Sequence, residues 1–387
     1  MKIAHIITRL IIGGAQENTL LSCEGQHARG HDVTLITGPA EGPEGSLMFR
    51  AKSAGYRVVV IDEMKRSILP VKDFRTYRRL QQVLRELRPD IVHTHSSKAG
   101  ILGRWAADAC RVPGIVHTIH GLAFTASTSR VVNHMYRALE RQAAPLTHRI
   151  VCVADSMRDQ SLAAGVGMPD QYVTVYSGMD TAPFLNPEIP PEIQRDRLGI
   201  RPDDVVVGTV ARLFHLKGHD DILDIAPRLA AAHPNVRFLW VGDGVLRGHF
   251  QVRMDQMGLR NRFIITGMVP PEQVPSLVGA MDILVHPSRR EGLARALPQG
   301  HLAAKPVITY DIDGAKEAVE HGVSGYVIDP FDKEEFLHRL QTLLANATLR
   351  TTFGLAGQAH ALARFDTSVM VEELEKVYAE LTTRLTP

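Results

Sequence analysis

The chain has 387 residues, of which 44% are hydrophobic and 22% charged, and its 44 basic and 42 acidic side chains leave a formal net charge of +2. This composition is close to the average of globular proteins and argues against disorder and fibrous structure, while the length predicts two domains of roughly 150–200 residues. The balanced charge argues against nucleic acid as the main partner, because binding to a phosphate backbone usually needs a strong basic excess.

The sequence contains no apolar run that approaches the roughly 18–20 residues needed to span a bilayer. The apolar start is interrupted by Arg9 and continues into GGAQEN instead of a small-residue cleavage site, which argues against a signal peptide. The cysteines are scattered and form no CxxC pair, which disfavours a disulfide framework and a zinc site. We therefore expect a cytoplasmic protein that could still contact the inner face of a membrane.

Short Val- and Ile-rich runs alternate with helical patterns along the whole chain. Continuous apolar runs predict parallel strands that are buried on both faces, and the repeated order of strand and helix predicts doubly wound α/β domains. Amphipathic stretches at 75–88, 221–233 and 370–385 predict helices. The predicted strands are 2–8, 32–38, 57–62, 90–95, 114–120, 149–154, 205–210, 237–242, 262–267, 282–288, 306–311 and 325–329.

The break between the domains is predicted near residues 181–204, where five prolines and few periodic apolar positions indicate a linker. We expect an N-terminal domain over 1–180 and a C-terminal domain over 205–365. The last helix, within 366–387, could pack back on the first domain or on the second. Two such domains would face each other across a cleft, and parallel sheets bind ligands at the carboxyl ends of their strands.

Two glycines follow the first predicted strand, in the loop that contains Gly13, Gly14 and Gln16. Glycines before a helix let backbone N–H groups approach an anionic or sugar ligand closely. Neither the dinucleotide fingerprint GxGxxG nor the P-loop pattern is present, which disfavours dehydrogenases and P-loop NTPases. A tight strand–helix turn without any ligand remains an equal alternative.

Four histidines gather at two predicted strand ends, in HTHSSKAG (His93 to Gly100) and HTIHG (His117 to Gly121). One such histidine is more often a hydrogen-bonded structural residue, but four beside glycines favour a ligand site. An HxH pair without a third ligand at a suitable spacing is weak evidence for zinc. Of the four, His120 is the strongest candidate.

The second half carries two further loops with chemical character. Arg212 and Lys217 follow a strand and could neutralise a diphosphate, although for an isolated pair a solvated basic loop is the better explanation. Glu291 and Gly292 follow another strand and precede an expected helix start, whose free N–H groups suit a phosphate. Because a carboxylate cannot serve the phosphate, Glu291 is expected to accept hydrogen bonds from sugar hydroxyls, unless it is only a charge at a helix N-terminus.

The ordered set of motifs GGAQ, HTHSSKAG, HTIHG, ARLFHLKG, VGDG and SRREGLARALPQG resembles the family-4 retaining glycosyltransferases of the GT-B fold, from Met1 to about residue 365. The two histidine motifs look most like members that act on lipid-linked or polysaccharide acceptors. The resemblance implies an α/β GT-B enzyme with two Rossmann-like domains. It also implies a nucleotide-diphosphate sugar as co-substrate and no further cofactor.

The resemblance also assigns roles to individual residues. It places His120 near the 6-position of the transferred sugar and Glu291 on that sugar. The donor diphosphate would be bound by Arg212 and Lys217, assisted by backbone amides, with Gly13 and Gly14 facing it. The remaining implied site residues are Gly292, Leu293, Ala294, Arg295, Gln299 and Met268 on the donor, and Gln16, His95 and Lys98 on the acceptor side.

Gln299 departs from the family pattern, because the family has a second glutamate there that grips the ribose hydroxyls. An amide can still bind a diol, but without the charge-assisted strength of a carboxylate, so weaker or altered nucleotide binding is expected. Pro298 predicts that the helix begins around Leu297 or is distorted there. Ala304 replaces the usual glycine before the KPV strand, and Ser177 stands where the family commonly has asparagine.

The expected reaction is the metal-independent transfer of a hexose or N-acetylhexosamine, with UDP favoured over GDP. No DxD stands in a metal-binding strand–loop setting, since the family gives Asp311 and Asp313 no metal role. Retention would follow from same-face attack, because Glu291 lies away from the anomeric carbon. A nucleotide-sugar 2-epimerase, a glycan phosphorylase without any visible pyridoxal site, and a non-catalytic sugar-nucleotide sensor remain as alternatives.

The stretch 65–88 contains eight Lys and Arg residues. These residues could dock on an anionic membrane near a lipid-linked acceptor. A solvated helix surface is the alternative, and it is slightly favoured by the sequence.

Overall fold

The computed structural model describes residues 1–41, 45–124 and 129–385. For residues 384 and 385 it describes the backbone alone. The chain forms two compact units. Unit 1 comprises Met1–Met179 together with the C-terminal segment from Thr367, and unit 2 comprises Asp180–Asp366.

Unit 1 is built on a parallel sheet with the strand order β3-β2-β1-β4-β5-β6-β7. Its central strands are buried along almost their whole length, as continuous Val and Ile runs predict. The short, half-buried edge strand β7 is the one strand of this sheet that the sequence pattern did not predict. The strands are β1 (Lys2–Arg9), β2 (Asp32–Gly38), β3 (Arg57–Val60), β4 (Ile91–His95), β5 (Gly114–Ile119), β6 (Arg149–Cys152) and β7 (Tyr172–Thr174).

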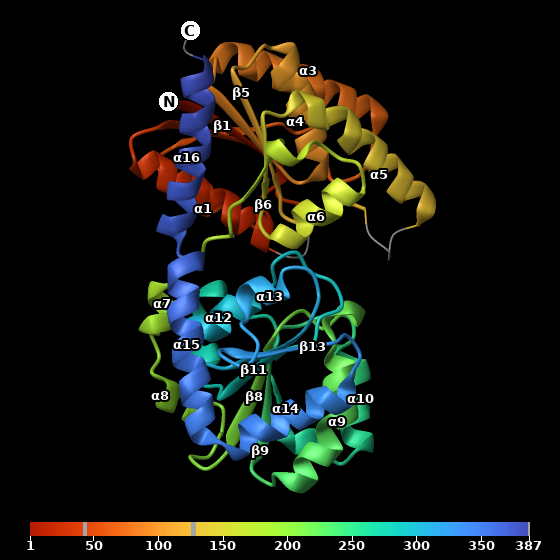
Figure 1. Cartoon of the computed structure of the whole chain (residues 1–387), viewed down its shortest axis with the longest axis vertical. Coiled ribbons are helices and arrows are strands. Elements are labelled where there is room, and N and C mark those ends of the chain that lie inside the picture. Colours follow the sequence, from red (N-terminus) through yellow and green to blue (C-terminus); the bar gives the residue numbers. More distant parts are fainter. Residues whose placement is uncertain (42–44, 125–128, 386–387) are drawn as a thin grey trace. The chain divides into compact units, whose positions relative to one another are not determined.

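Helices cover both faces of this sheet (Figure 1). One core contains Leu80 and Val83 of α3 with Leu102 of α4, and the other contains Leu21 of α1 with Tyr378 of α16. The C-terminal helix α16 therefore completes the layer that α1 begins, and the two helices pack together. The helices are α1 (Gly14–Ala28), α2 (Met48–Ser53), α3 (Pro70–Leu87), α4 (Ser97–Ala109), α5 (Arg130–Ala143), α6 (Asp155–Ala163) and α16 (Thr367–Leu385).

Unit 2 repeats the arrangement, with the strand order β10-β9-β8-β11-β12-β13. All strands are parallel, and each contains part of a segment that the sequence predicted as a strand. The strands are β8 (Val205–Val210), β9 (Val236–Val241), β10 (Phe263–Ile265), β11 (Ile283–His286), β12 (Val307–Tyr310) and β13 (Gly325–Ile328).

The helices of unit 2 also form two layers. The main core draws on α9, α10 and α14 together with Phe353 of α15, and α12 and α15 pack together against β11–β13. The helices are α7 (Ala182–Leu185), α8 (Pro191–Arg197), α9 (His219–Ala232), α10 (Arg247–Gln256), α11 (Val274–Gly279), α12 (Ala296–Leu302), α13 (Ala315–Ala318), α14 (Lys333–Ala345) and α15 (Ala347–Phe365). Single 3₁₀ turns lie at Ala144–Leu146, Pro169–Gln171, His215–Lys217, Arg260–Arg262 and Pro271–Gln273.

The expected linker 181–204 is instead part of unit 2. Its prolines begin the short helices α7 and α8, which pack on α11, because proline is well placed in the first turn of a helix. The Arg195 guanidinium donates to a carboxylate oxygen of Asp282 at 3.0 Å and to the backbone carbonyl of Asp204 at 2.5 Å. The proline content therefore marks helix starts here, and these contacts hold the segment against unit 2.

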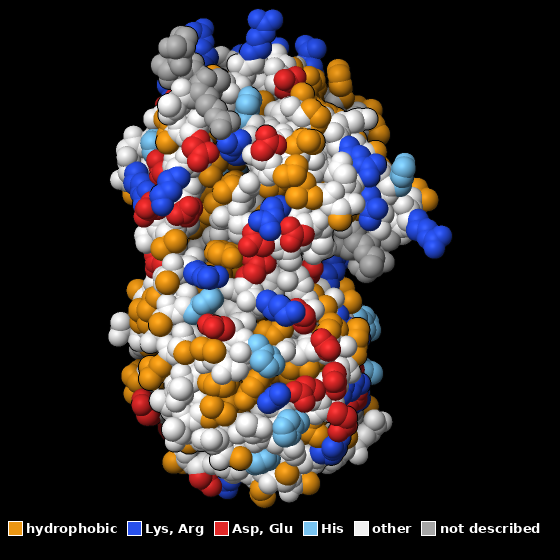
Figure 2. Space-filling model, in the orientation of Figure 1, with side chains coloured by type: hydrophobic (Ala, Val, Ile, Leu, Met, Phe, Trp, Pro, Cys, Tyr) orange, Lys and Arg blue, Asp and Glu red, His pale blue; other side chains and the backbone are white. Residues whose placement is uncertain are grey.

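Within the described residues, no helix combines the length and the apolar character that crossing a bilayer requires. Acidic and basic side chains are interspersed over the face of the molecule seen in Figure 2, in keeping with the net charge of +2.

Candidate active site

In unit 2, the loops after β8 and β11 bring the two predicted site residues Lys217 and Glu291 together with His286. The strands β8 and β11 are paired in parallel, so their carboxyl ends lie at the same edge of the sheet. The Lys217 ammonium lies 2.5 Å from Oε1 of Glu291, and Nε2 of His286 lies 3.0 Å from the same oxygen. The exposed fractions of these side chains are only 21%, 18% and 4% in the order Lys217, Glu291, His286.

The electrostatic environment keeps Glu291 ionised. Burial raises the pKa of its carboxyl, but the hydrogen bond and charge of His286 and the charge of Lys217 outweigh this effect and hold the pKa at about 2. Glu291 is therefore a permanent anion at physiological pH, suited to accepting hydrogen bonds.

Gly218 holds the loop of Lys217 against the loop that follows β11. Its φ is +74°, in the left-handed region, and a Cβ built on it would lie 1.9 Å from the carbonyl oxygen of Pro287. Only glycine permits this approach. The contact positions Lys217 beside Glu291.

Arg212, in the same loop as Lys217, is exposed, and its guanidinium lies over the ring of Phe214 at 4.9 Å from the centroid. Within residues 1–41, 45–124 and 129–385 no acidic side chain pairs with it. The structure therefore joins Lys217 to Glu291 but leaves Arg212 outside this pair, with its charge turned to solvent.

The expected helix start at Gly292 is wrong, whereas the start around Leu297 that Pro298 predicted is confirmed. Gly292, Leu293, Ala294 and Arg295 form a loop, and α12 begins at Ala296. Pro298 explains this start, because proline is tolerated in the first turn, where the N–H groups have no partner within the helix. The loop itself is held by Asp313, whose carboxylate accepts a hydrogen bond from the backbone N–H of Glu291 at 3.0 Å.

The two residues expected near the nucleotide lie on separate elements of unit 2. Gln299 is half-buried in the first turn of α12, directly after the Glu291 loop. Met268 follows β10, and 71% of its side chain is exposed. Both follow the carboxyl ends of strands, β11 for Gln299 and β10 for Met268.

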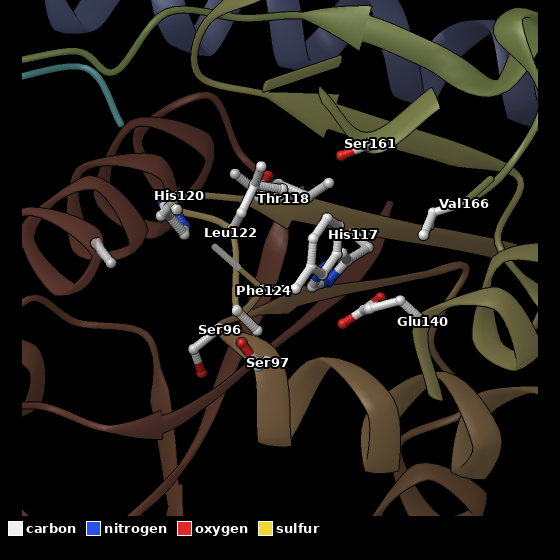
Figure 3. Close-up of a pocket in the computed structure, with 14 residues that line it drawn as sticks. Ser96, Ser97, His117, Thr118, His120, Leu122, Phe124, Glu140, Ser161 and Val166 are labelled. Carbon is white, nitrogen blue, oxygen red and sulfur yellow. The ribbon is translucent and has the colours of Figure 1, made fainter. Parts of the chain in front are cut away.

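Unit 1 has a pocket of about 260 Å³ at the carboxyl ends of β4 and β5. Figure 3 shows His120, Ser96 and Ser97 at one side of it and the Glu140 carboxylate pointing in from α5. Glu140 is paired with the buried guanidinium of Arg104 at 2.6 Å. The remaining lining residues are Ala15, His117, Thr118, Ile119, Gly121, Leu122, Ala123, Phe124, Ser161 and Val166.

Ser96 stands out in this pocket because its backbone is strained. Its φ of +61° with ψ of 157° is a conformation that residues other than glycine rarely adopt. A hydrogen bond between its hydroxyl and that of Thr8, at 2.8 Å, holds it there. Such strain is typical of functional sites.

The glycine loop after β1 contains the beginning of α1. Gly13 is followed directly by the helix, and a Cβ built on Gly13 would lie 2.8 Å from Oε1 of Gln16. The amide of Gln16 therefore covers the Gly13 backbone, whereas Gly14 is exposed. Ala15, the next residue, reaches the pocket of unit 1.

His95 and Lys98, both expected on the acceptor side, bond to other residues of unit 1. His95 is fully buried, with Nε2 at 2.9 Å from His5 and Nδ1 at 3.0 Å from His120. Lys98 donates to the Ser67 carbonyl at 2.5 Å and is ion-paired with Asp73, at the start of α3. Both residues are thus engaged within unit 1.

Sequence reasoning overlooked four residues that the structure connects to these sites: His286, His5, Gln26 and Tyr378. His5 lies within the apolar run of β1 and His286 ends the apolar run of β11, so both could be noticed in the sequence. The sequence offered no indication of Gln26 and Tyr378, because only the packing of α1 and α16 brings them to the histidines.

Comparisons with known proteins agree with this architecture. The family model described as "Glycosyl transferase 4-like domain" matches residues 13–178, and the model "Glycosyl transferases group 1" matches residues 191–360. The structure is similar to that of HepE from Anabaena in complex with UDP, with a TM-score of 0.84 and 21% identity over 98% of this chain and 100% of that one.

Two curated relatives cover most of the chain. One is the UDP-Gal:alpha-D-GlcNAc-diphosphoundecaprenol alpha-1,3-galactosyltransferase of Escherichia coli, which is 28% identical over 88% of this chain and 87% of its own length. The other is the putative glycosyltransferase EpsD of Bacillus subtilis (strain 168), which is 27% identical over 82% and 83%. The chain therefore belongs to the family-4-like glycosyltransferases of the GT-B fold, and it is an enzyme of that class.

Proposed function

We propose that the enzyme transfers a hexose or N-acetylhexosamine from a UDP-sugar to a glycan or lipid-linked acceptor, with retention of configuration and without a metal ion. The observation that carries this proposal is the cluster of Lys217, Glu291 and His286 at the carboxyl ends of β8 and β11. It combines a cation, a permanent anion and a hydrogen-bond donor where α/β sheets bind ligands.

Breaking a glycosyl–phosphate bond leaves negative charge on the departing diphosphate. Cations and N–H dipoles that are already in place stabilise this charge as it develops. Lys217, the exposed guanidinium of Arg212 and the backbone amides of the Gly292–Arg295 loop would supply this stabilisation. The side chains of the protein thus provide the charge that a metal would otherwise contribute.

Glu291 would accept hydrogen bonds from hydroxyl groups of the transferred sugar. The oxygen Oε1 already accepts from both Lys217 and His286, which makes the carboxylate a weak nucleophile and a well-oriented acceptor. A covalent glycosyl-enzyme needs a nucleophilic carboxylate at the anomeric carbon. These contacts support same-face attack, in which the leaving phosphate accepts the acceptor's proton.

The relatives support the choice of UDP and of a lipid-linked acceptor. The name of the Escherichia coli relative specifies UDP-Gal and a diphosphoundecaprenol acceptor, and the HepE structure contains UDP. In unit 1, the pocket beside His120 has an apolar lining of Leu122, Phe124 and Val166, next to the carboxylate of Glu140. Such a mixed pocket suits an acceptor with both apolar and hydroxyl groups.

The direct test is Glu291→Gln, assayed for release of UDP and for the anomeric configuration of the product. The fold should persist while kcat falls about 10²–10³-fold, as for the loss of one preorganised electrostatic contact. Glu334→Gln is the matched control, because Glu334 is exposed and pairs with Arg228 in the same unit. Near-normal turnover of Glu291→Gln would refute the role of Glu291 on the donor.

The same assay without acceptor separates the alternatives. A transferase releases UDP slowly from the donor alone and faster with acceptor, a sensor releases none, and an epimerase converts the sugar without net transfer.

We further infer that α3 places unit 1 on an anionic membrane. The exposed apolar side chains Ile68, Val71 and Phe74 lie next to exposed cations, among them Arg75 and Arg78. Apolar and cationic side chains together are the combination that binds membrane interfaces. The side chain of Phe74 is 63% exposed, and a large apolar side chain in water beside other exposed apolar residues is typical of an interaction surface.

Co-sedimentation with liposomes tests this contact. Wild-type protein should sediment with vesicles that contain phosphatidylglycerol and much less with neutral vesicles. Arg75→Glu/Arg78→Glu should abolish sedimentation, whereas Arg228→Glu/Arg260→Glu, on exposed cations of unit 2, should not. Equal binding by both double variants would exclude α3 as the contact.

A further inference from the structure

A chain of hydrogen bonds leads from His120 into the interior of unit 1. His120 Nε2 lies 3.0 Å from Nδ1 of His95, and Nε2 of His95 lies 2.9 Å from Nδ1 of His5. His5 Nε2 in turn lies 2.7 Å from Oε1 of Gln26. The imidazoles of His95 and His5 therefore connect the candidate active-site residue His120 to a buried amide on α1.

The same amide begins a second branch. Nε2 of Gln26 lies 3.2 Å from the hydroxyl of Tyr378, which lies 2.5 Å from Nδ1 of His93. His93 Nε2 lies 2.6 Å from the hydroxyl of Thr118. The amide of Gln26 is thus the junction of the two branches, held between α16 and the sheet.

The histidines inside this network are neutral. Burial lowers the pKa of His5 to about 4, an effect that the hydrogen bond to Gln26 only partly offsets, and burial also holds the pKa values of His93 and His95 well below their usual range. A neutral imidazole has one N–H donor and one acceptor nitrogen. In a chain of such rings, the position of one hydrogen determines the positions of all the others.

The orientation of the Gln26 amide determines the direction of the chain. With the oxygen facing His5, His5 must donate through Nε2 and accept through Nδ1. His95 then donates to His5 and accepts from His120. The hydrogen of His120 therefore lies on Nε2, and its Nδ1 is the nitrogen with the lone pair.

Rotating the amide by 180° reverses every one of these bonds. The amide nitrogen would then donate to His5, His5 to His95, and His95 to His120, so that the hydrogen of His120 moves to Nδ1. The hydroxyl of Tyr378 can serve either orientation, since it can accept from the amide nitrogen and donate to His93 or do the reverse, and the structure has the first orientation, with Oε1 toward His5 and Nε2 toward Tyr378. In both arrangements every bond along the chain has a donor and an acceptor. They differ at Nδ1 of His120, which carries a lone pair in the first and a hydrogen in the second.

A metal site is the competing interpretation of three close histidines. One ring nitrogen from each of His5, His93 and His95 lies within 4.8 Å of the others. However, both nitrogens of each ring already have hydrogen-bond partners, and the rings are fully buried. A cation would have to break these bonds to bind.

We propose that Gln26 is a positioning residue for glycosyl transfer: through His5 and His95, the orientation of its amide selects which nitrogen of His120 bears the hydrogen. The inference rests on the proposed function and on the role that the family resemblance implies for His120, near the 6-position of the transferred sugar. In the selected tautomer, Nδ1 of His120 accepts a hydrogen bond from a sugar hydroxyl. In the other tautomer it can only donate.

The test compares the full-length chain with Gln26→Met, which keeps the size of the side chain but removes both polar atoms. Ser22→Ala is the control, because Ser22 lies one turn earlier on the same buried face of α1 and its hydroxyl bonds the Asn18 carbonyl. Ring ¹⁵N chemical shifts of histidine-labelled protein report the tautomer of His120, assigned from the signals lost in His120→Asn. Steady-state kinetics with a UDP-sugar give kcat and KM.

Wild type and Ser22→Ala should show one His120 tautomer, with the hydrogen on Nε2. Gln26→Met should show both tautomers and a fall in kcat of about tenfold with unchanged KM for the donor, the size expected for one hydrogen bond. Tyr378→Phe, which removes the partner of the amide nitrogen and frees the amide to rotate, should give the same mixture and serves if Gln26→Met does not fold.

An unchanged His120 tautomer in Gln26→Met and Tyr378→Phe would overturn the proposal. An equal loss of kcat in Ser22→Ala would also overturn it, since the effect would then come from α1 packing. One equivalent of zinc in the purified wild type, lost in His5→Gln, would replace it with a metal site. If the wild type transfers no sugar, the proposed function fails, while the ¹⁵N shifts still decide whether Gln26 sets the tautomer.

Discussion

The ammonium of Lys217 and the carboxylate of Glu291 lie 2.5 Å apart, although 74 residues separate them in the chain. The pair joins the loops that follow β8 and β11, and His286 completes it from the end of β11. Because both side chains are largely shielded from water, neither charge is easily stabilised without the other.

Replacing Lys217 by methionine should therefore lower both stability and activity. The free energy of unfolding should fall by about 1–3 kcal/mol, since a half-buried carboxylate loses its partner, and kcat/KM should fall about 10²–10³-fold. Urea unfolding and steady-state kinetics measure the two effects. Lys316→Met is the control, because the Lys316–Asp311 pair is exposed and should contribute little. Equal effects of both variants would contradict the prediction.

The ionisation of Glu291 predicts a particular pH dependence of stability. Its pKa falls from 4.5 to about 2 on folding, so its stabilising contribution is complete above pH 4.5 and is lost as the pH falls toward 2. The difference in unfolding free energy between wild type and Glu291→Gln should thus be constant from pH 8 to 5 and shrink below 4.5. Chemical denaturation at pH 7, 5 and 3.5 measures it. A difference that is the same at all three values would show that the pKa is not lowered.

Restoring a carboxylate at position 299 should strengthen nucleotide binding. Hydrogen bonds to ionised acceptors are about twice as strong as neutral ones, so Gln299→Glu should lower the Kd for UDP by about fivefold. Isothermal titration calorimetry measures the change. Gln256→Glu, at the exposed end of α10, adds the same charge elsewhere and should leave the Kd unchanged. Weaker binding by Gln299→Glu would mean that the ribose lies elsewhere.

Ala304 is a strained position that glycine should relieve. Its φ is +54°, and the left-handed region costs a residue with a Cβ about 1–2 kcal/mol. Ala304→Gly should therefore stabilise the protein by up to about 1 kcal/mol, after subtracting the greater chain entropy of glycine. The converse variant Gly258→Ala, at φ +67° with open space around it, should destabilise by a similar amount. Thermal unfolding of the two variants tests both signs, and a lower Tm for Ala304→Gly would contradict the argument from strain.

Several features of the fold could be predicted because they depend on local patterns. Continuous apolar runs identified twelve strands, and the motif around Lys217 and Glu291 located the charged cluster of unit 2. The edge strand β7 was missed, because its three half-buried residues make too short a pattern. The segment 181–204 was misread because proline serves a linker and a helix start equally well.

The histidine network shows the other limit. His5 and His93 face each other in the register of β1 with β4, and the strand pattern alone could not reveal that pairing. Gln26 and Tyr378 meet there only because α16 returns from the end of the chain to pack beside α1. Their side chains look like ordinary helix residues in the sequence.

The sequence by itself determined the fold class, the order of the strands along the chain and the residue types at the strand ends, since these follow from periodicity and local turn chemistry. Only the tertiary structure decided which of those residues share a site. Lys217 pairs with Glu291, and His95 turns inward to His120, because strand register and helix packing set distances that no local pattern contains.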